Sequence, residues 1–220
     1  MKRRKEKLVK FLEVEEIKNF QIPLINKVKK ALNEDNKNSI TDKIAIRDFA
    51  LISLVYSCAL RISEACKLEI EDLDLNKKLI YILDSKGDDR IVPIPEPVIK
   101  ILNEWLEIRP NRKNNPYVFI NIKGSTRPGA ERHVNQKYYN QLFNRLSIAT
   151  GVKLKDGSNV HPHTLRHSRA MEIYDSGTQL EMLQAILGHK DIKTTQVYCK
   201  VRTEKLNEIQ QTVTGGIIEI

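Results

Sequence analysis

The longest stretch of this chain without a charged side chain runs from Phe49 to Leu60. It falls well short of the roughly 18 apolar residues that a membrane-spanning helix needs. It belongs to a longer apolar segment, Ile44 to Leu60, that leaves no polar face, and a helix of this kind must be covered on all sides. We therefore predict a helix near Asp42–Tyr56 at the centre of a globular domain, with N-cap chemistry from Thr41 and Asp42.

Composition and charge narrow the class of protein. With 220 residues, 40% of them hydrophobic and 30% charged, the chain suits one large globular domain or a domain with a small appendage. Lys and Arg outnumber Asp and Glu by 37 to 28, a formal net charge of +9. This excess favours a polyanionic partner such as DNA or RNA, although an ordinary solvated basic surface accounts for the charge equally well.

Cysteine usage and the first residues bear on the compartment. Cys58, Cys66 and Cys199 are far apart and form no CxxC pair, so neither a disulfide framework nor a zinc knuckle is predicted, and a reducing, cytoplasmic compartment fits. The basic start MKRRKEK leads into no apolar segment and does not resemble a secretory signal. We expect residues 1–10 to be a DNA-contacting arm, a linker or a solvated terminus.

Helical periodicity dominates the chain. Beyond the central helix it predicts helices near Val14–Phe20, Ile22–Leu32, Ile62–Leu68, Glu96–Ile108 and Glu131–Ala149. The segment LIYILDSKGDDRIVPIP predicts a hairpin with strands Leu79–Leu83 and Arg90–Ile94 and Lys86 at the turn, and a short strand at Tyr117–Ile120 would extend the sheet. We expect a mainly α fold with a small antiparallel β-sheet, of the α+β class.

The C-terminal part contains several helix boundaries. The motif TQLE matches a capping box and opens a helix that ends at Gly188. Asp191 then caps a short helix, DIKTTQVY, with Tyr198 near its end. The next segment, VRTEKLNEIQQ, predicts a further helix, followed by two glycines and the apolar tail IIEI.

Two basic side chains open another helix. Pro162 and Thr164 mark its start near His163, and Gly177 fits its end. His163 and Arg166 have i, i+3 spacing in its first turn, where free backbone N–H groups and the helix dipole favour an anion.

A second arginine has its own carboxylate. Arg61 opens the helix RISEACKL, and Glu64 lies three residues later on the same face, where it could hold Arg61 in place or form only a surface ion pair. An arginine offers a planar fork of donors that matches two phosphate oxygens and stays charged. Arg61 and Arg166 together could therefore neutralise a phosphorane in its transition state.

Other candidates are ambiguous one at a time. Lys86 on a turn could give a proton to a leaving alkoxide, but Lys-Gly turns are ordinary exposed hairpin tips. His189, just past a helix end, could equally be a capping or core histidine. Tyr198 alone would be assigned to the core or the surface.

A metal or nucleotide cofactor is not expected. His161, His163 and His167 invite a zinc site, but no carboxylate or thiolate partner is evident and one helix start cannot direct all three inward. We expect His167 to be a structural histidine packed behind Arg166. The chain contains neither GxxxxGK[ST] nor GxGxxG.

Taken in order, the motifs ALRISEACKL, SKGDDRIVPIP, HPHTLRHS and LGHKDIKTTQVY resemble the active-site boxes of the tyrosine recombinase (lambda integrase) family. The resemblance runs from about Phe11 to just beyond Tyr198 and implies that family's catalytic fold, which type IB topoisomerases share. It implies that Arg61 and Arg166 clamp a scissile phosphate and that Tyr198 is the nucleophile. Lys86 resembles the general acid that protonates the leaving 5′ oxygen.

The remaining positions follow the same pattern. His163 corresponds to the family histidine that assists proton transfer at the tyrosine, and His189 to the residue that hydrogen-bonds a non-bridging oxygen. Glu64 matches the acidic residue behind the first arginine. Two departures, ALR in place of GLR and Cys199 after the tyrosine, remove no reacting group.

The resemblance implies a site-specific DNA recombinase that forms a 3′-phosphotyrosine without metal, ATP or cofactor. The outcome of the recombination would be integration, excision, inversion or resolution. Residues 11–200 would be the catalytic domain and 201–220 a C-terminal helix and tail. Ile217, Ile218 and Ile220 would dock on a neighbouring protomer or on their own domain. The family's N-terminal clamp domain is not seen, which suggests an excised domain or a short member such as the fimbrial-switch invertases.

The implied partners are double-stranded DNA, further copies in a dimer or tetramer on DNA, and accessory DNA-bending or directionality proteins, with no membrane and a cytoplasmic, nucleoid-associated location. Three other functions share parts of this chemistry. A type IB topoisomerase would relax supercoils without a specific site, and a DNA-binding module would not cleave at all. A metal-free phosphatase lacks a CX5R loop in this sequence.

Overall fold

This computed structural model describes residues 9–33, 39–83, 89–111, 115–123 and 133–212, with side chains as far as residue 203. The helices are α1 (Val14–Asn33), α2 (Ile40–Ser57), α3 (Ile62–Lys67), α4 (Glu96–Ile108), α5 (Gln136–Thr150), α6 (Pro162–Asp175), α7 (Leu180–Leu187) and α8 (Ile192–Thr212). The predicted mainly α fold with a small antiparallel sheet is confirmed. None of the described helices is long and apolar enough to cross a membrane.

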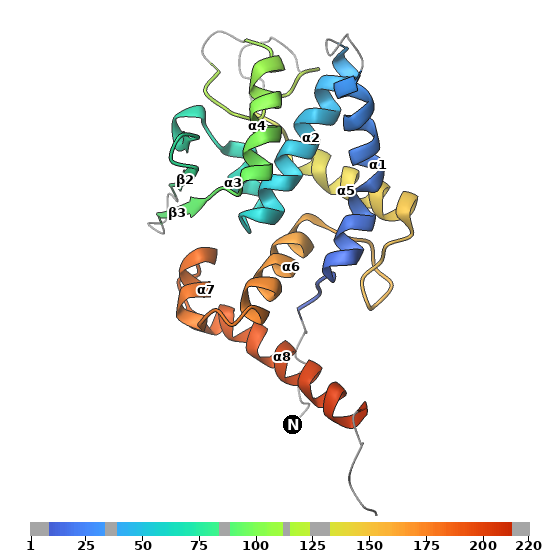
Figure 1. The fold of residues 1–220 in the computed structure, drawn as a ribbon, viewed down its shortest axis with the longest axis vertical. Helices are drawn as coiled ribbons and strands as arrows, with labels where there is room; N and C mark the ends of the chain where they lie inside the picture. Colours follow the sequence, from blue (N-terminus) through green and yellow to red (C-terminus); the bar gives the residue numbers. More distant parts are fainter. Residues whose placement is uncertain (1–8, 34–38, 84–88, 112–114, 124–132, 213–220) are drawn as a thin grey trace, which may run out of the picture.

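Helix α2 lies at the centre of the molecule, between α1 and α4 and above α6, as its apolar sequence predicts (Figure 1). The prediction that Thr41 and Asp42 cap this helix is wrong. The helix begins at Ile40 because Ser39 is the N-cap, and its hydroxyl accepts a hydrogen bond from the Asp42 N–H at 3.1 Å. Asp42 instead lies in the first turn, where a carboxylate suits the helix dipole.

Helix α1 is continuous, although two helices are predicted on either side of Gln21. Pro23 lies inside it, and an interior proline removes a backbone hydrogen bond. The apolar face nevertheless continues through this point at helical spacing, with buried side chains at Ile17, Phe20, Leu24, Val28 and Ala31. Burial of one unbroken face against α2 and α5 therefore outweighs the local cost of the proline.

The sheet has the order β1-β2-β3, with β1 at Leu73–Asp74, β2 at Leu79–Ile82 and β3 at Arg90–Pro93. The predicted hairpin is confirmed, and its antiparallel register pairs Ile82 with Arg90. The prediction that Tyr117–Ile120 forms the third strand is wrong, because β1 takes that place. The ends of that segment make isolated bridges, Tyr117 with Glu69 and Ile120 with His133, because it packs beside the core rather than along the hairpin edge.

Helix α5 begins at Gln136, five residues after the predicted start at Glu131. Asn135 is its N-cap, and the side-chain oxygen accepts a hydrogen bond from the Lys137 N–H at 2.7 Å. Helical periodicity does not reveal this start, because capping rather than apolar spacing decides where a helix can begin.

Helices α6, α7 and α8 share a second, smaller apolar cluster below the body formed by α1–α5 (Figure 1). Tyr198 is one of its buried members, together with Met171, Leu183 and Leu187. The N-terminal segment also reaches this cluster through Val9 and Phe11.

Two boundary predictions in this region are corrected. The TQLE motif forms no capping box, because α7 begins one residue later than predicted, after Gln179, without a side-chain cap. Helix α8 is not short: capped by Asp191, it runs on to Thr212, so Tyr198 lies in its second turn rather than near its end. The ends at Gly177 and Gly188 are confirmed, and both glycines have positive φ.

A buried ion pair lies in the apolar centre. The Arg47 guanidinium donates to the Asp48 carboxylate from Nε at 3.0 Å and from Nη2 at 2.7 Å. Asp48 also accepts hydrogen bonds from the hydroxyls of Tyr138 and Tyr139 on α5, and Arg47 donates to the Ile120 carbonyl. This network joins α2, α5 and the segment after α4, and it satisfies both buried charges.

Replacing Asp48 with Ala should lower the free energy of unfolding by about 3–5 kcal/mol, because the change leaves the Arg47 charge buried without a partner. Urea denaturation would measure the loss. The matched control is Glu15→Ala, which removes an exposed ion pair with Lys18 and should cost no more than about 1 kcal/mol. Equal losses for the two variants would contradict this account of the network.

Candidate active site

Two of the predicted site residues, Arg61 and Arg166, contact the C-terminal end of α7. Arg61 is the N-cap of α3, and its Nη2 donates to the Gly188 carbonyl at 2.9 Å. Arg166 on α6 donates from Nη1 to the Ala59 carbonyl at 2.8 Å and from Nη2 to the Leu187 carbonyl. The C-terminal end of α7 therefore brings together two arginines that are far apart in the sequence.

The Glu64 carboxylate is the centre of this arrangement rather than half of a surface ion pair. It accepts from Arg61 Nη1 at 2.7 Å and from the Arg61 backbone N–H at 2.7 Å, and its side chain is 12% exposed. Arg166 Nη1 lies 3.8 Å away. Burial alone would raise the pKa of Glu64, but hydrogen bonds and charge from Arg90, the Arg61 N–H and the Arg166 charge lower it.

Arg90 is a site residue that the sequence did not indicate. It begins β3, and both its terminal nitrogens reach the Glu64 carboxylate, at 3.1 and 2.8 Å. Its side chain is 6% exposed. A Cβ added at Gly188 would lie 2.9 Å from its Nη1, so Gly188 is needed there both for its positive φ and for this close approach. An alternating strand pattern does not reveal a buried arginine, because the carboxylate that pairs with it comes from another element.

The nucleophile candidate is buried and already hydrogen-bonded. Tyr198 is 1% exposed, and its hydroxyl lies 2.8 Å from Nδ1 of His167. Burial raises the pKa of Tyr198 to about 12, although the Arg166 charge opposes the shift. His167 was expected to be a structural histidine behind Arg166. It instead contacts the oxygen of the candidate nucleophile.

The other two histidines lie beside the arginines. Burial lowers the pKa of His163, and the charges of Arg166 and Arg61 add to this effect. Burial and the same two arginines lower the pKa of His189 to about 4, and its Nδ1 lies 3.0 Å from the Thr195 hydroxyl. Both rings are therefore uncharged at neutral pH.

Arg166 keeps its charge in this setting. Burial and the charges of Arg61 and Arg90 lower its pKa to about 10, although the Glu64 charge opposes the shift. At neutral pH the region thus holds three arginines against one carboxylate, an excess of positive charge suited to a phosphate. Arg61, whose side chain is 30% exposed, is the arginine of the three most open to solvent.

Other predicted features are not placed. Lys86 and the tail residues Ile217, Ile218 and Ile220 lie outside the described residues. Among the residues that are described, no three His, Cys, Asp or Glu side chains form a group that could hold a metal ion. The rings of His163 and His167 are 6.5 Å apart.

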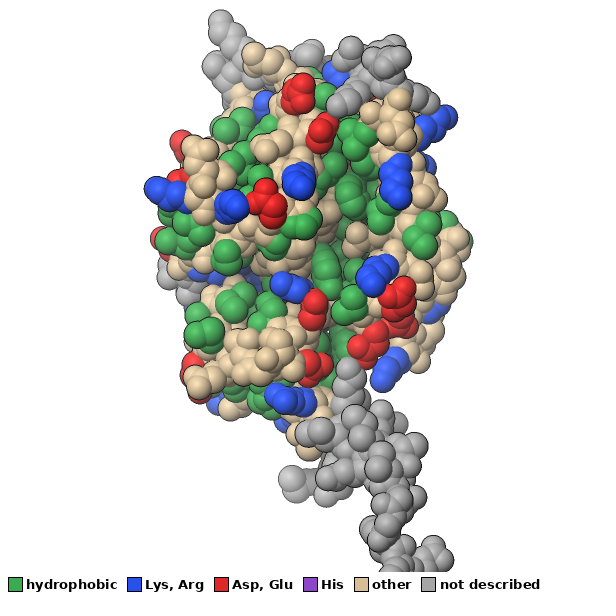
Figure 2. Space-filling view, viewed as in Figure 1, with side chains coloured by type: hydrophobic (Ala, Val, Ile, Leu, Met, Phe, Trp, Pro, Cys, Tyr) green, Lys and Arg blue, Asp and Glu red, His purple; other side chains and the backbone are tan. Residues whose placement is uncertain are grey.

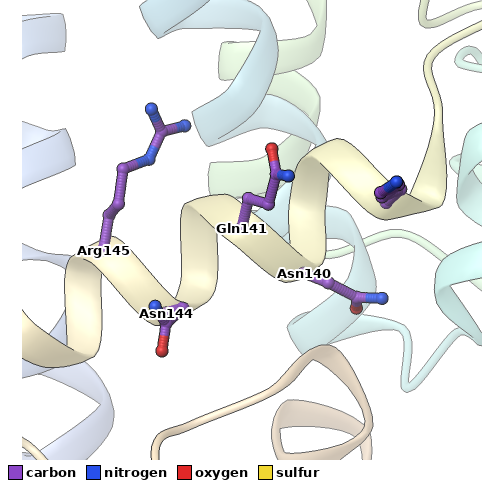
Figure 3. Close-up of a pocket in the computed structure, with 5 residues that line it drawn as sticks. Asn140, Gln141, Asn144 and Arg145 are labelled. Carbon is purple, nitrogen blue, oxygen red and sulfur yellow. The ribbon is translucent and has the colours of Figure 1, made fainter.

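A polar face of α5 forms a shallow surface hollow. It is lined by Lys137, Asn140, Gln141, Asn144 and Arg145, all exposed on one helix (Figure 3). Elsewhere the charges are mixed: Figure 2 shows Lys and Arg side chains scattered among Asp and Glu side chains rather than gathered in one patch. The positive balance of the chain is therefore not concentrated on the face seen there.

Comparisons with known proteins identify the family of the chain. A sequence model of the phage integrase family matches residues 24–205. The chain is 33% identical over 216 residues to the tyrosine recombinase XerA of Pyrococcus horikoshii, covering 93% of this chain and 70% of that protein. It is 29% identical over 175 residues to the tyrosine recombinase XerC of Corynebacterium glutamicum, and the match covers 79% of this chain and 53% of that protein.

Solved structures of recombinases have a similar fold. A crystal structure of XerA recombinase aligns with a TM-score of 0.70 at 25% identity, covering 96% of this chain and 67% of that one. XerH site-specific recombinase, solved with its difH substrate after cleavage, aligns with a TM-score of 0.72 at 25% identity, covering 93% and 53%. The chain thus spans between about half and 70% of these relatives. The family match over most of the chain, together with the arginine and tyrosine geometry, shows that it belongs to the phage integrase family of tyrosine recombinases.

Proposed function

We propose that this chain is the catalytic part of a site-specific recombinase that cleaves and rejoins double-stranded DNA through a 3′-phosphotyrosine at Tyr198. One observation carries the proposal: the Tyr198 phenol is buried beside Arg166, which shares the Glu64 carboxylate with Arg61. Residues 11–200 form the catalytic domain, and residues 201–220 form the C-terminal helix and tail.

The reaction needs neither metal nor ATP. The Tyr198 oxygen attacks phosphorus, the bond to the 5′ oxygen breaks, and the energy of the phosphodiester is kept in the new bond. Arg61 and Arg166 neutralise the charge that develops on the phosphate oxygens. Lys86 protonates the 5′ oxygen, and His189 donates to a non-bridging oxygen, while the family pattern assigns the assisting role at the tyrosine to His163.

Binding of DNA requires the site to open. Tyr198 is 1% exposed, and Arg61 and Arg166 donate to the carbonyls of Gly188 and Leu187. A phosphate must therefore compete with the C-terminal end of α7 for these donors. Movement of the end of α7, which carries Leu183 and Leu187 of the cluster around Tyr198, would free the arginines and uncover the phenol while α6 and α8 stay packed.

The partners follow from the same proposal. The similarity to a recombinase solved with its DNA substrate supports double-stranded DNA as the ligand. We propose that copies of the chain assemble as a dimer or tetramer on DNA, with the tail exchanged between protomers, and that accessory DNA-bending or directionality proteins join them. We also propose a cytoplasmic, nucleoid-associated location, because the proposed substrate is DNA.

Covalent trapping tests the reaction. Incubated in EDTA with a library of nicked duplexes that carry a randomised centre, the protein should form a denaturant-resistant adduct, and Tyr198→Phe should form none. Sequencing the trapped DNA would give the preferred site. Tyr174→Phe is the matched control, because this tyrosine lies in the same cluster and its hydroxyl contacts Cys199 instead.

Several outcomes would contradict the proposal. An adduct that still forms with Tyr198→Phe would exclude this nucleophile, and a requirement for Mg²⁺ would exclude the arginine-based mechanism. Relaxation of plasmids without a preferred site would indicate a topoisomerase, and specific binding without an adduct would indicate a DNA-binding module.

Glu64→Gln should slow adduct formation at least tenfold and lower the free energy of unfolding by about 1–3 kcal/mol, because the arginines lose the charged partner of their hydrogen bonds. The folded-state pKa of Glu64 is lowered, so its contribution is present above its unfolded pKa and is lost as the pH falls through the folded pKa. Urea denaturation of both proteins should therefore show a gap at neutral pH that closes in acid.

The control for Glu64 is Glu96→Gln, which removes an exposed ion pair with Lys78. It should leave the free energy of unfolding and the adduct rate nearly unchanged, because an exposed ion pair contributes little. A Glu64→Gln protein with normal rate and stability would mean that the arginines hold their positions without the carboxylate.

The polar face of α5 is proposed to read DNA, because Asn, Gln, Lys and Arg are the side chains that bond to base edges and phosphates. Gln141→Ala should change the base preference at one position, by about 1–3 kcal/mol. Lys137→Ala should weaken binding to all duplexes. It should also reduce the slope of the logarithm of the binding constant against the logarithm of salt concentration by about one. Fluorescence anisotropy on trapped and scrambled duplexes would measure both, with Lys100→Ala on α4 as control; three identical profiles would contradict the proposal.

A further inference from the structure

The hydrogen bond between Tyr198 and His167 links the candidate nucleophile to a second titratable group. The phenol oxygen and Nδ1 of the ring are 2.8 Å apart, and the tyrosine is almost fully buried. His167 lies on α6 directly after Arg166, while Tyr198 comes from α8, so the contact forms only when these helices pack. It is within the distance at which a base can take a proton.

The direction of this hydrogen bond follows from the chemistry of the two groups. A neutral histidine has one N–H and one acceptor nitrogen. A buried phenol O–H must donate, and within the described part of the chain no acceptor other than Nδ1 contacts the Tyr198 oxygen. Nδ1 of His167 is therefore the acceptor, and the ring carries its proton on Nε2.

His163 does not make this contact. It lies one turn earlier on the same face of α6, with its ring 6.5 Å from that of His167. No hydrogen bond joins His163 to Tyr198 among the described residues, whereas the rings of His167 and Tyr198 are 6.0 Å apart and their polar atoms touch. His167 is therefore the histidine of this pair that contacts the nucleophile.

We propose that His167 is the base that accepts the phenol proton of Tyr198 as its oxygen attacks the DNA phosphate. This inference rests on the proposed function and deepens it. The O–H proton moves to Nδ1, the phenol oxygen bonds to phosphorus, and the bond to the 5′ oxygen breaks as Lys86 gives that oxygen a proton. In the rejoining step each proton returns, so neither base nor acid is consumed.

The charges around His167 keep it neutral until DNA arrives. Burial lowers its pKa to about 4, and positive groups add to this effect. The titratable and charged groups around it are His161 at the N-cap of α6, His163 and Arg166 on α6, His189 after α7 and Tyr198 on α8. Glu64, Arg61 and Arg90 act through Arg166.

Because the pKa of Tyr198 is about 12, the proton stays on the tyrosine in the free protein. A bound phosphodiester brings a negative charge beside the arginines, offsets their effect on the ring and makes His167 a stronger base in the complex.

Adduct formation on the trapped duplex tests the proposal. His167→Ala should slow the reaction at neutral pH by about 10²–10⁴-fold, the usual contribution of a general base. Its rate should then rise tenfold for each pH unit, because the phenol must ionise unaided, while the wild-type rate stays nearly flat above the pKa of His167. Circular dichroism and duplex binding would show that the variant is folded and binds DNA.

A conservative variant separates proton transfer from positioning. In His167→Gln the amide oxygen can accept the hydrogen bond from Tyr198 but cannot take the proton. This variant should be as slow as His167→Ala and show the same pH dependence. Normal activity in His167→Gln would overturn the proposal, since it would show that the ring only positions the phenol. The same would follow if His163→Ala, and not His167→Ala, produced the pH-dependent defect.

A duplex with sulfur in place of the bridging 5′ oxygen identifies the end of the reaction at which His167 acts. A thiolate leaves without protonation, because thiols ionise near pH 8.5. This substrate should restore cleavage by Lys86→Ala and leave His167→Ala slow; restored cleavage by His167→Ala would assign the ring to the leaving group instead. Failure of the wild-type protein on every duplex would refute the proposed function itself, whereas wild-type activity with an unimpaired His167→Ala would refute only this inference.

Discussion

The Glu64 carboxylate is the interaction on which the site depends. It binds Arg61 from its own helix turn and Arg90 from the hairpin, and it lies close to Arg166 on α6. Three guanidinium groups cannot share so small a buried space without a negative charge among them. Glu64 therefore allows positive charge to be concentrated where a phosphate can use it, and it ties the hairpin to two helices.

The position of the nucleophile depends on a separate packing unit. Tyr198 is buried in the small cluster of α6, α7 and α8, while α2 and the network around Asp48 stabilise the larger body. Besides the packing of α6 against α2, polar contacts at the end of α7 connect them, where carbonyls of Leu187 and Gly188 accept from the two arginines. A small apolar cluster costs less to rearrange than the main core, so the end of α7 can move while Glu64 continues to hold the arginines.

Much of the fold could be predicted from local patterns. The central position of α2, the bounds of α4 and the hairpin follow from apolar periodicity and turn chemistry. The errors lie where tertiary packing overrides a local rule: the continuous apolar face of α1 carries the helix through Pro23, and Tyr117–Ile120 packs beside the core instead of joining the sheet. Caps such as Ser39 and Asn135 decide helix starts by single hydrogen bonds that periodicity does not contain.

The sequence by itself determined the class of the fold, the family and the identity of the candidate residues, because helical spacing and short ordered motifs are local properties of a chain. Only the tertiary structure decided which of these residues touch. The pairing of Arg90 with Glu64 and the hydrogen bond between His167 and Tyr198 join elements distant in sequence. Buried charges and phenols take partners from whichever element packs against them, and no spacing along the chain encodes that choice.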